Sequence, residues 1–338
     1  GMLISQLGNP DLTWERTYTT GFGIDASLWD NRLHFNLDLY SKKTDNILYN
    51  VPVTGLIGVT NIYRNIGKMD NKGIEVSIGG DIIRSKDFTW SLDANLGHNA
   101  NKLTDIFRQY DATTGQFVAK PVIIGDGTGI SGTASRILEI GSPIDTYYMK
   151  EWAGVNKEDG RPQWYKDDGK GGKVVTKNYA EADYYKLGNA APKLFGGFST
   201  NLRWRQLDFA LAFGYSLGGQ IYNYSRQEYD SDLAYADRNQ MVLRPGWSRW
   251  QKAGDEATHP RALYNNKDGG NKASSRYLED ASFLKLRSLS LGYNFSLPQL
   301  KIQTLRLYVN AENLLTFTKY SGVDPELPSS SGTVMGTT

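Results

Sequence analysis

The sequence predicts an all-β protein, an antiparallel up-and-down transmembrane β-barrel, and three observations support that prediction. Long segments alternate strictly between apolar and polar residues, which gives a strand one apolar and one polar face. Several of these segments reach the roughly 9 to 11 residues that a tilted strand needs to cross a bilayer, against about 5 to 6 in soluble proteins. Short connections alternate with long polar ones. A large soluble β-sandwich is the alternative that these patterns leave open.

The first predicted hairpin joins residues 18–28 to the segment RLHFNLDLY, residues 32–40, through a turn at Asp30 and Asn31. Asp and Asn tolerate the positive φ that tight hairpin turns require. The resulting register places three apolar pairs opposite one another: Leu28 with Leu33, Ala26 with Phe35, and Ile24 with Leu37. Both strands therefore have their apolar side chains on one face.

Three further hairpins repeat this construction. The second pairs Ile82 with Phe88 across IRSKD and continues to Ile74 opposite Leu96. The third turns at Arg205 and Gln206 and pairs Trp204 with Leu207, Leu202 with Phe209, and Phe198 with Phe213. The fourth turns through LPQLKIQ and pairs Leu289 with Ala311, Leu291 with Val309, Tyr293 with Leu307, and Phe295 with Leu305. A change of phase between Leu286 and Leu289 predicts a β-bulge.

The connections are unequal in a way that is typical of outer-membrane barrels. Short turns follow Leu28, Ile82, Trp204 and Leu297, whereas long polar loops are predicted at residues 49–70, 104–134, 167–193 and 223–281. Three tryptophans lie within a few residues of a short turn, where an aromatic girdle would sit at the membrane interface: Trp29, Trp90 and Trp204.

Composition excludes some functions without choosing between barrel and sandwich. The chain has 38 Lys and Arg against 36 Asp and Glu, so it lacks the basic excess of a nucleic-acid binder. It has no cysteine, which excludes thiolate metal sites and a cysteine nucleophile. The mean hydropathy of −0.49 is typical of soluble proteins, but the polar lumen of a barrel lowers the average in the same way.

Two glycine-rich stretches invite a ligand-binding interpretation. Gly127, Gly129 and Gly132 have the spacing of a dinucleotide-binding turn, but no helix pattern follows them, so a loop without a cofactor is expected. The segment DDGKGGKVV from Asp167 is similar to a calcium loop but lacks the alternating oxygen ligands and the closing glutamate, which favours a solvated turn.

No other residues converge on a catalytic or metal site. The three histidines, His34, His98 and His259, are scattered along the chain, so no metal ligand set is predicted. Five carboxylates fall on the polar faces of predicted strands, where a water-filled lumen needs polar residues: Asp25, Asp38, Glu75, Asp81 and Asp93. We therefore predict no catalytic residues and no cofactor, and an enzyme is not expected.

Six segments resemble, in order and over nearly the whole chain, the C-terminal half of the barrel in the SusC/RagA class of TonB-linked outer-membrane transporters. They are NPDLTWERTYTTGFGIDASLWDNRLHFNLDLYSKKTDNIL, NIGKMDNKGIEVSIGGDIIRSKDFTWSLDANLGHNANKL, LGNAAPKLFGGFSTNLRWRQLDFALAFGYSLGGQIYN, SRWQKAGDEATHPR, SSRYLEDASFLKLRSLSLGYNFS and LRLYVNAENLLTFTKYSGVDPE. Their joint occurrence is specific, although no single segment would be.

The resemblance implies a 22-stranded barrel with an N-terminal plug in the outer membrane of Bacteroidetes. It implies import of oligosaccharides or peptides, energised through TonB and assisted by a SusD-like surface lipoprotein that acts as a lid. Residues 1–338 are then one domain, a partial barrel of a TonB-dependent transporter embedded in outer-membrane lipids.

The chain departs from the family pattern at both ends. The plug, the TonB-contacting segment and the first half of the barrel have no counterpart in the sequence. The sequence stops at SSSGTVMGTT, before the closing strand with its terminal aromatic that the family pattern has. We count about ten strands when residues 146–155 and 162–166 are taken as a weak extra pair. The first and last strands then have unpaired edges, so we expect this chain alone to self-associate and not to transport.

Loop tryptophans are the candidate ligand-binding residues. In the resembling family the loops and upper lumen face the cargo, which makes Trp164, Trp247 and Trp250 candidates for stacking on sugar rings. The alternative for each is that it packs one loop against another or lies in the interfacial belt. If the sandwich alternative holds, the chain is a soluble extracellular protein that binds glycans or mediates adhesion.

Overall fold

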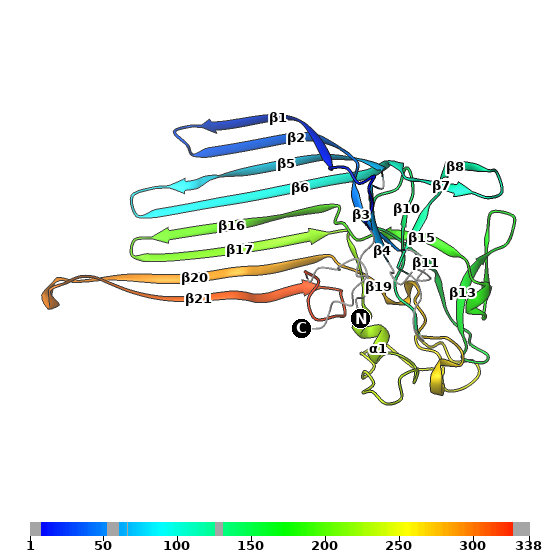
Figure 1. Cartoon of the computed structure of the whole chain (residues 1–338). Helices are drawn as coiled ribbons and strands as arrows, with labels where there is room; N and C mark the ends of the chain where they lie inside the picture. Colours follow the sequence, from blue (N-terminus) through cyan, green and yellow to red (C-terminus); the bar gives the residue numbers. More distant parts are fainter. Residues whose placement is uncertain (1–7, 53–60, 66, 126–130, 327–338) are drawn as a thin grey trace, which may run out of the picture.

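One long antiparallel sheet dominates the fold (Figure 1). The computed structural model describes residues 8–52, 61–65, 67–125 and 131–326. Eight strands form this sheet, which we call the wall, in the order β1-β2-β5-β6-β16-β17-β20-β21. Their bounds are β1 Arg16–Leu28, β2 Leu33–Asp45, β5 Gly67–Arg84, β6 Phe88–Ile106, β16 Leu194–Trp204, β17 Leu207–Leu217, β20 Phe283–Leu297 and β21 Ile302–Thr318. Most are longer than the strands of soluble sheets, as a tilted bilayer-crossing strand requires.

The register of the wall separates its two faces row by row. One row across β1, β2, β5, β6 and β16 is apolar throughout and consists of Ala26, Phe35, Ile78, Ala94 and Phe198. The neighbouring row is polar or glycine and consists of Asp25, Asn36, Ser77, Asn95 and Gly197. Because successive side chains on a strand point to opposite faces, one face of the wall is apolar and the other polar.

The apolar face of the wall is exposed. Phe22, Ile78, Leu307 and Val309 keep 60%, 48%, 58% and 65% of their surface, and no described segment covers them. A soluble β-sandwich would bury such a face against a second sheet, since this much exposed apolar surface is unfavourable in water. The arrangement is therefore that of a barrel wall whose outer face meets lipid.

The polar face contains the carboxylates predicted for the lumen, and several of them pair with neighbouring strands. Asn36 donates to Asp25 over 2.6 Å. His34 of β2 and Asp93 of β6 lie 3.0 Å apart across the intervening strand β5. Gly79 of β5 lies directly between them in register, and a Cβ there would collide with both side chains. Glycine at this position is what allows the two strands to share an ion pair.

The predicted hairpins are confirmed in three of four registers. Leu28 lies opposite Leu33, Trp204 opposite Leu207, and Leu291 opposite Val309. The predicted bulge is also present, as a register shift between Leu286 and Ser288. The first turn is also as predicted: the backbone N–H of Arg32 donates to the Trp29 carbonyl over 3.1 Å, and Asp30 and Asn31 between them have positive φ.

The predicted register of the second hairpin is wrong by two residues. Leu96 pairs with Val76, and Ile74 pairs with His98. A bulge between Asp81 and Ile83 shifts the strands, and Ser85 fixes a tight turn through hydrogen bonds with Phe88. A shift of two residues keeps the same faces together, which is why the apolar pattern alone did not reveal it.

The expected count of about ten wall strands is also corrected, since eight described strands form the wall. The extra pair is real, but it belongs to small sheets beyond the wall. The strands outside the wall are β3 Leu48–Pro52, β4 Asn61–Asn65, β7 Arg108–Asp111, β8 Gln116–Ala119, β9 Val122–Ile124, β10 Arg136–Leu138, β11 Thr146–Lys150, β12 Trp152–Val155, β13 Pro162–Asp167, β14 Lys173–Thr176, β15 Tyr184–Asn189, β18 Gln220–Tyr222 and β19 Leu278–Asp280.

These small sheets and their connections form a loop head at the end of the wall opposite the short turns (Figure 1). The buried apolar clusters of the described residues lie where the wall strands enter the head and within it. One contains Ile47, Leu103, Ile106 and Leu138, and the other Tyr147, Met149, Tyr222 and Tyr277. The described parts of the predicted long loops therefore contain short strands and buried apolar clusters of their own.

Helices are few and short in the described part of the chain. The α-helix α1 spans Tyr224–Tyr229, and 3-10 turns span Tyr179–Glu181, Tyr264–Asn266, Ser275–Tyr277 and Pro298–Leu300. None of the described helices has the length and hydropathy of a membrane-spanning helix.

Candidate functional site

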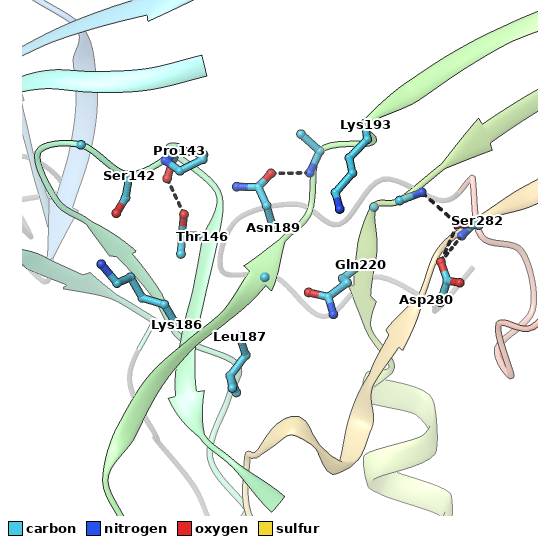
Figure 2. Close-up of a pocket in the computed structure, with 15 residues that line it drawn as sticks. Ser142, Pro143, Thr146, Lys186, Leu187, Asn189, Lys193, Gln220, Asp280 and Ser282 are labelled. Atoms are coloured by element: carbon cyan, nitrogen blue, oxygen red, sulfur yellow. Dashed lines mark hydrogen bonds between the residues drawn. The ribbon is translucent and has the colours of Figure 1, made fainter. Parts of the chain in front are cut away.

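A pocket of about 750 Å³ lies where the loop head meets strands β16 and β17 of the wall (Figure 2). The β15 strand supplies Lys186 and Asn189, the start of β18 supplies Gln220, and the segment after β19 supplies Ser282. We call it the head pocket. Its lining combines charged, amide and hydroxyl groups, as in sites that fix the orientation of a ligand.

Asp280 contributes a carboxylate that is held in its ionised form. The hydroxyl and the backbone N–H of Ser282 both donate to Asp280 Oδ1, the latter over 2.9 Å. Hydrogen bonding by Ser282 lowers the pKa of Asp280 below its usual 3.8. Ser282 Oγ in turn accepts from the backbone N–H of Gly218 over 2.9 Å, which ties β19 to the end of β17.

Two lysines bring positive charge to the same pocket. Lys186 Nζ donates to Glu139 over 2.7 Å, and this contact lowers the pKa of Glu139. Lys193 lies at the entry of β16, where its backbone carbonyl contacts His98. Its ammonium group has no hydrogen-bond or ion-pair partner among the described residues.

Two amide side chains in the lining have unsatisfied polar atoms. Asn189 Oδ1 accepts from the backbone N–H of Ala191 over 2.7 Å, but its Nδ2 is buried without a partner among the described residues. Gln220 Oε1 is likewise buried and unpaired. Because buried polar atoms are nearly always hydrogen-bonded, a donor and an acceptor remain here for water or a ligand. The arrangement is suited to binding polar molecules.

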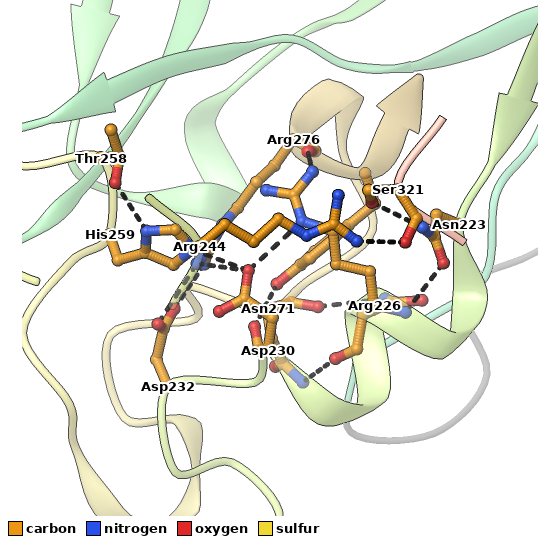
Figure 3. Close-up of polar contacts among 12 residues, drawn as sticks. Asn223, Arg226, Asp230, Asp232, Arg244, Thr258, His259, Asn271, Arg276 and Ser321 are labelled. Atoms are coloured by element: carbon orange, nitrogen blue, oxygen red, sulfur yellow. Dashed lines mark hydrogen bonds and ion pairs between the residues drawn. The ribbon is translucent and has the colours of Figure 1, made fainter. Parts of the chain in front are cut away.

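A network of buried charges stabilises the loop head beside this pocket (Figure 3). Arg276 donates through both terminal nitrogens to Asp232, with Nη2 to Oδ1 at 3.2 Å, and to the carbonyl of Gly270 at 2.8 Å. Arg249 donates to the same Oδ1 over 2.6 Å. The side chains of Arg276 and Asp232 are only 2% and 5% exposed. Burial opposes ionisation of Arg276, but the charge of Asp232 prevails and raises its pKa.

Asp230 is the second carboxylate of this network. It accepts from His259 Nε2 over 2.9 Å and lies 3.4 Å from Arg226 Nε. Burial alone would raise the pKa of Asp230, but the hydrogen bond to His259 and the charges of Arg276 and Arg226 lower it below 3.8. Arg226 also donates to Glu279 over 3.0 Å, so the network connects α1 to β19.

The three predicted ligand-binding tryptophans all lie in the loop head but not in one site. Trp164 of β13 has no exposed surface and makes edge contacts with Trp152 and Tyr179. Trp247 lies between Arg226 and Arg244, with ring centroids 4.6 and 5.5 Å from the guanidinium carbons. Trp250 is half-buried and donates from Nε1 to the carbonyl of Lys157 over 2.8 Å. Stacking on cargo stays a prediction, and loop packing accounts for these contacts.

The loop at Asp167 has its carboxylates engaged with its own backbone. Asp167 Oδ1 accepts from Gly169 N over 2.7 Å, and Asp168 Oδ1 accepts from Lys170 N and Gly172 N over 2.7 and 2.8 Å. These backbone N–H groups lower the pKa of Asp168. No group of three or more metal-ligating side chains occurs among the described residues. Gly127 and Gly129 of the glycine motif lie outside the described residues.

Sequence reasoning missed the head pocket and the charge network. The network joins residues up to 53 positions apart, Arg226 and Glu279, and no periodic pattern reports such a contact. The available signal was the segment SSRYLED, which contributed to the family resemblance but had no role assigned to its arginine.

Comparison with known families agrees with this geometry. The family described as "TonB dependent receptor-like, beta-barrel" matches residues 3–185, more than half of the chain. The chain belongs to this family. It is thus a β-barrel chain of the TonB-dependent receptors, which are outer-membrane proteins, and its exposed apolar wall is the surface that such a location requires.

Curated relatives of this TonB-dependent receptor chain come from Bacteroidetes. The TonB-dependent receptor P3 of Formosa agariphila is 32% identical over 96% of this chain and 32% of its own length. The TonB-dependent receptor SusC of Bacteroides thetaiotaomicron is 26% identical over 95% of this chain and 30% of its own length. The chain thus spans about a third of the length of these receptors.

Solved structures show the same fold. A chain of the RagAB peptide transporter superposes with a TM-score of 0.77 and 29% identity, covering 96% of this chain and 34% of that chain. The RagAB peptide importer in its "open-open" state gives a TM-score of 0.72 with 30% identity. The sandwich alternative is therefore wrong for this chain.

Proposed function

We propose that residues 1–338 form part of the barrel domain of a TonB-dependent importer that carries oligosaccharides or peptides across the outer membrane. The observation that carries the proposal is the two-faced wall, apolar outside and polar inside, with an ordered head and an open pocket at one end. A polar inner face provides a wet passage, and the head pocket provides a place where cargo is bound before it enters that passage.

The partners follow from the family. We propose that TonB supplies energy through a part of the receptor outside this chain, and that a SusD-like lipoprotein covers the loop head. The SusC relative and the RagAB structures support this assignment. The relatives are receptors and transporters, which supports a role in uptake without catalysis.

Between the two cargo classes, the chemistry of the head pocket favours a peptide. It offers a carboxylate at Asp280, the ammonium of Lys193, and an amide donor and acceptor at Asn189 and Gln220, the last three without a partner among the described residues. A peptide carries both charges and a regular series of amide donors and acceptors. A neutral oligosaccharide can hydrogen-bond to the amides of Asn189 and Gln220 but has no charge to pair with Asp280 or Lys193. The solved structures with similar folds are named as a peptide transporter.

An uptake experiment tests this proposal in the complete receptor. Cells with Lys193→Ala and Gln220→Ala are expected to take up labelled peptides at least several-fold more slowly than the parent. The matched controls are Lys170→Ala, in an exposed turn, and Gln163→Ala, in β13, since neither residue lines the pocket. A triple substitution of Trp164, Trp247 and Trp250 in the same assay tests the stacking prediction.

Three outcomes of the uptake experiment would each contradict a different part of the proposal. Loss of oligosaccharide uptake with intact peptide uptake would replace the cargo class but keep the importer. Equal rates for the pocket and control variants would remove the head pocket from cargo binding. Unchanged uptake in a strain that lacks the whole receptor would overturn the importer function itself.

A further inference from the structure

A second kind of hollow occurs on the apolar outer face of the wall, at the end with the short turns. It has a volume of about 590 Å³ and is bounded by Trp29, Arg32, Leu33, Ile78, Ile82 and Ala94. We call it the rim groove. It lies on the face that meets lipid, away from the head pocket and the charge network.

The groove exists because a small residue interrupts each of two rows of larger ones on this face, Ala94 in one row and Gly80, between Leu33 and Leu92, in the other. Ala94 stands in the same outward row as Phe35, Ile78 and Phe198. Gly80 lies where β5 comes closest to the end of the first turn, and the backbone N–H of Asp81 donates to the Arg32 carbonyl over 2.9 Å. A Cβ on Gly80 would collide with that carbonyl, so the backbone approach itself requires glycine there.

Trp29 and Arg32, two side chains of the types that contact lipid headgroups, lie at the rim of the groove. Trp29 is 71% exposed, at the level where an interfacial tryptophan sits. The Arg32 side chain makes one long hydrogen bond, to the Asp81 carbonyl at 3.5 Å, and no ion pair among the described residues. The nearby Asp81 carboxylate contacts Arg84 at 3.6 Å instead. Most of the five N–H donors of Arg32 therefore remain available, and a guanidinium binds phosphate through paired donors.

A second groove on the same face gives a comparison. It has a volume of about 570 Å³ and is lined by Phe88, Leu202, Trp204, Leu207, Phe209 and Leu291. No charged side chain belongs to its lining, so it can hold an acyl chain but has nothing to select a headgroup. The rim groove differs in having charged residues in its lining: Arg32, together with Asp81, which contacts Arg84, and Asp93, whose carboxylate contacts His34 on the polar face.

We propose that the rim groove is a binding site for one glycerophospholipid from the leaflet that surrounds the short turns. One acyl chain lies along Ile78 and Ala94, Trp29 lies beside the glycerol backbone, and the phosphate accepts hydrogen bonds from Arg32. This inference depends on the membrane location of the wall and is independent of the cargo.

The test is native mass spectrometry of the complete receptor, released from nanodiscs that contain phosphatidylglycerol and phosphatidylethanolamine. We expect one phospholipid to be retained per receptor. Ala94→Phe fills the groove and should abolish retention. Ala26→Phe is the matched control, because Ala26 lies in the same outward row but does not line the groove. Gel mobility with and without heating verifies that both variants are folded.

A second pair of variants tests the headgroup without filling the groove. Arg32→Gln should lower the retained phospholipid by about tenfold or more, the value of one charge-assisted hydrogen bond. Arg205→Gln changes an arginine at another short turn that does not line the groove, and it should have no effect. Equal losses for Arg32→Gln and Arg205→Gln, or for Ala94→Phe and Ala26→Phe, would overturn the proposal. Retention of lipopolysaccharide in place of a phospholipid would overturn it as well.

Discussion

Substitution of Arg276 by methionine should loosen the loop head while leaving the wall intact. Methionine preserves much of the volume of the side chain but removes its charge, so Asp232 and Asp230 lose a cation that lies almost wholly out of solvent. Removing one partner of a buried ion pair costs about 3–5 kcal/mol, because the charge that stays buried is then less well compensated. Asp232 keeps Arg249, and Asp230 keeps His259 and Arg226. That cost is equivalent to a roughly hundred-fold to several-thousand-fold rise in the equilibrium constant for local opening.

Hydrogen exchange of the complete receptor in nanodiscs measures this change directly. Amides of residues 223–281 should lose protection by that factor, whereas amides of β5 and β6 should not change. The control is Lys157→Met, which breaks the exposed pair with Glu256, whose side chains are 59% and 78% exposed. An exposed pair contributes about 0–1 kcal/mol, so protection should fall about fivefold or less.

A double variant separates a charge effect from a packing effect. Asp232→Asn removes the carboxylate that Arg276→Met leaves with Arg249 as its remaining cation, so the double variant should be less destabilised than the sum of the two single variants. If Arg276→Met and Lys157→Met reduced protection equally, or if the two single effects simply added, the buried network would not be what stabilises the head.

Two further predictions concern pH and the lumenal face. The pKa of Asp230 is lowered in the fold, so its contribution to stability is complete above its ordinary value of 3.8 and is lost as the pH falls through the lower folded value. Protection of the loop head should therefore decline on acidification below pH 3.8, and Asp230→Asn should be less protected at neutral pH and lack that decline. Gly79→Val should destabilise the wall by about 1–3 kcal/mol, because its Cβ collides with His34 and Asp93, whereas Ser77→Val on the same face should cost less. Denaturant titration of the folded band on unheated gels measures the difference, and equal midpoints would contradict the role assigned to Gly79.

Much of the wall could be predicted because the alternation of apolar and polar residues depends only on the surroundings of each strand. A strand between lipid and water must alternate with period two, so Ile24, Ala26 and Leu28 report their own environment whatever their partners are. The turn at Arg205 and Gln206 fixes one register, and the pairing of Trp204 with Leu207 follows. The second hairpin shows the limit, since a bulge at Asp81 moves the register by two residues without changing any face.

The head could not be predicted in the same way because its information is distributed. Asp230, His259 and Arg276 come from separate segments, and their types alone are equally typical of a solvated loop. Their burial depends on how three loops fold together. Trp164 illustrates the same limit, because a loop tryptophan has the same sequence signature whether it is exposed to cargo or, as here, packed on Trp152 and Tyr179.

Along the proposed transport path, the charged groups of the lumenal face differ from those of the head pocket in whether they have partners. On the lumenal face, His34 is paired with Asp93, and Arg306 donates to both oxygens of Asp208 over 2.6 and 2.7 Å. These two pairs are satisfied by their neighbours, so they help to keep a passage wet but have little left to hold a passing ligand. In the head pocket the ammonium of Lys193 and one amide atom each of Asn189 and Gln220 have no partner in the part of the chain that the structure describes. Under the proposed function, selectivity therefore resides in the head, and the rigidity that the Arg276 network gives the head is what keeps those groups in position.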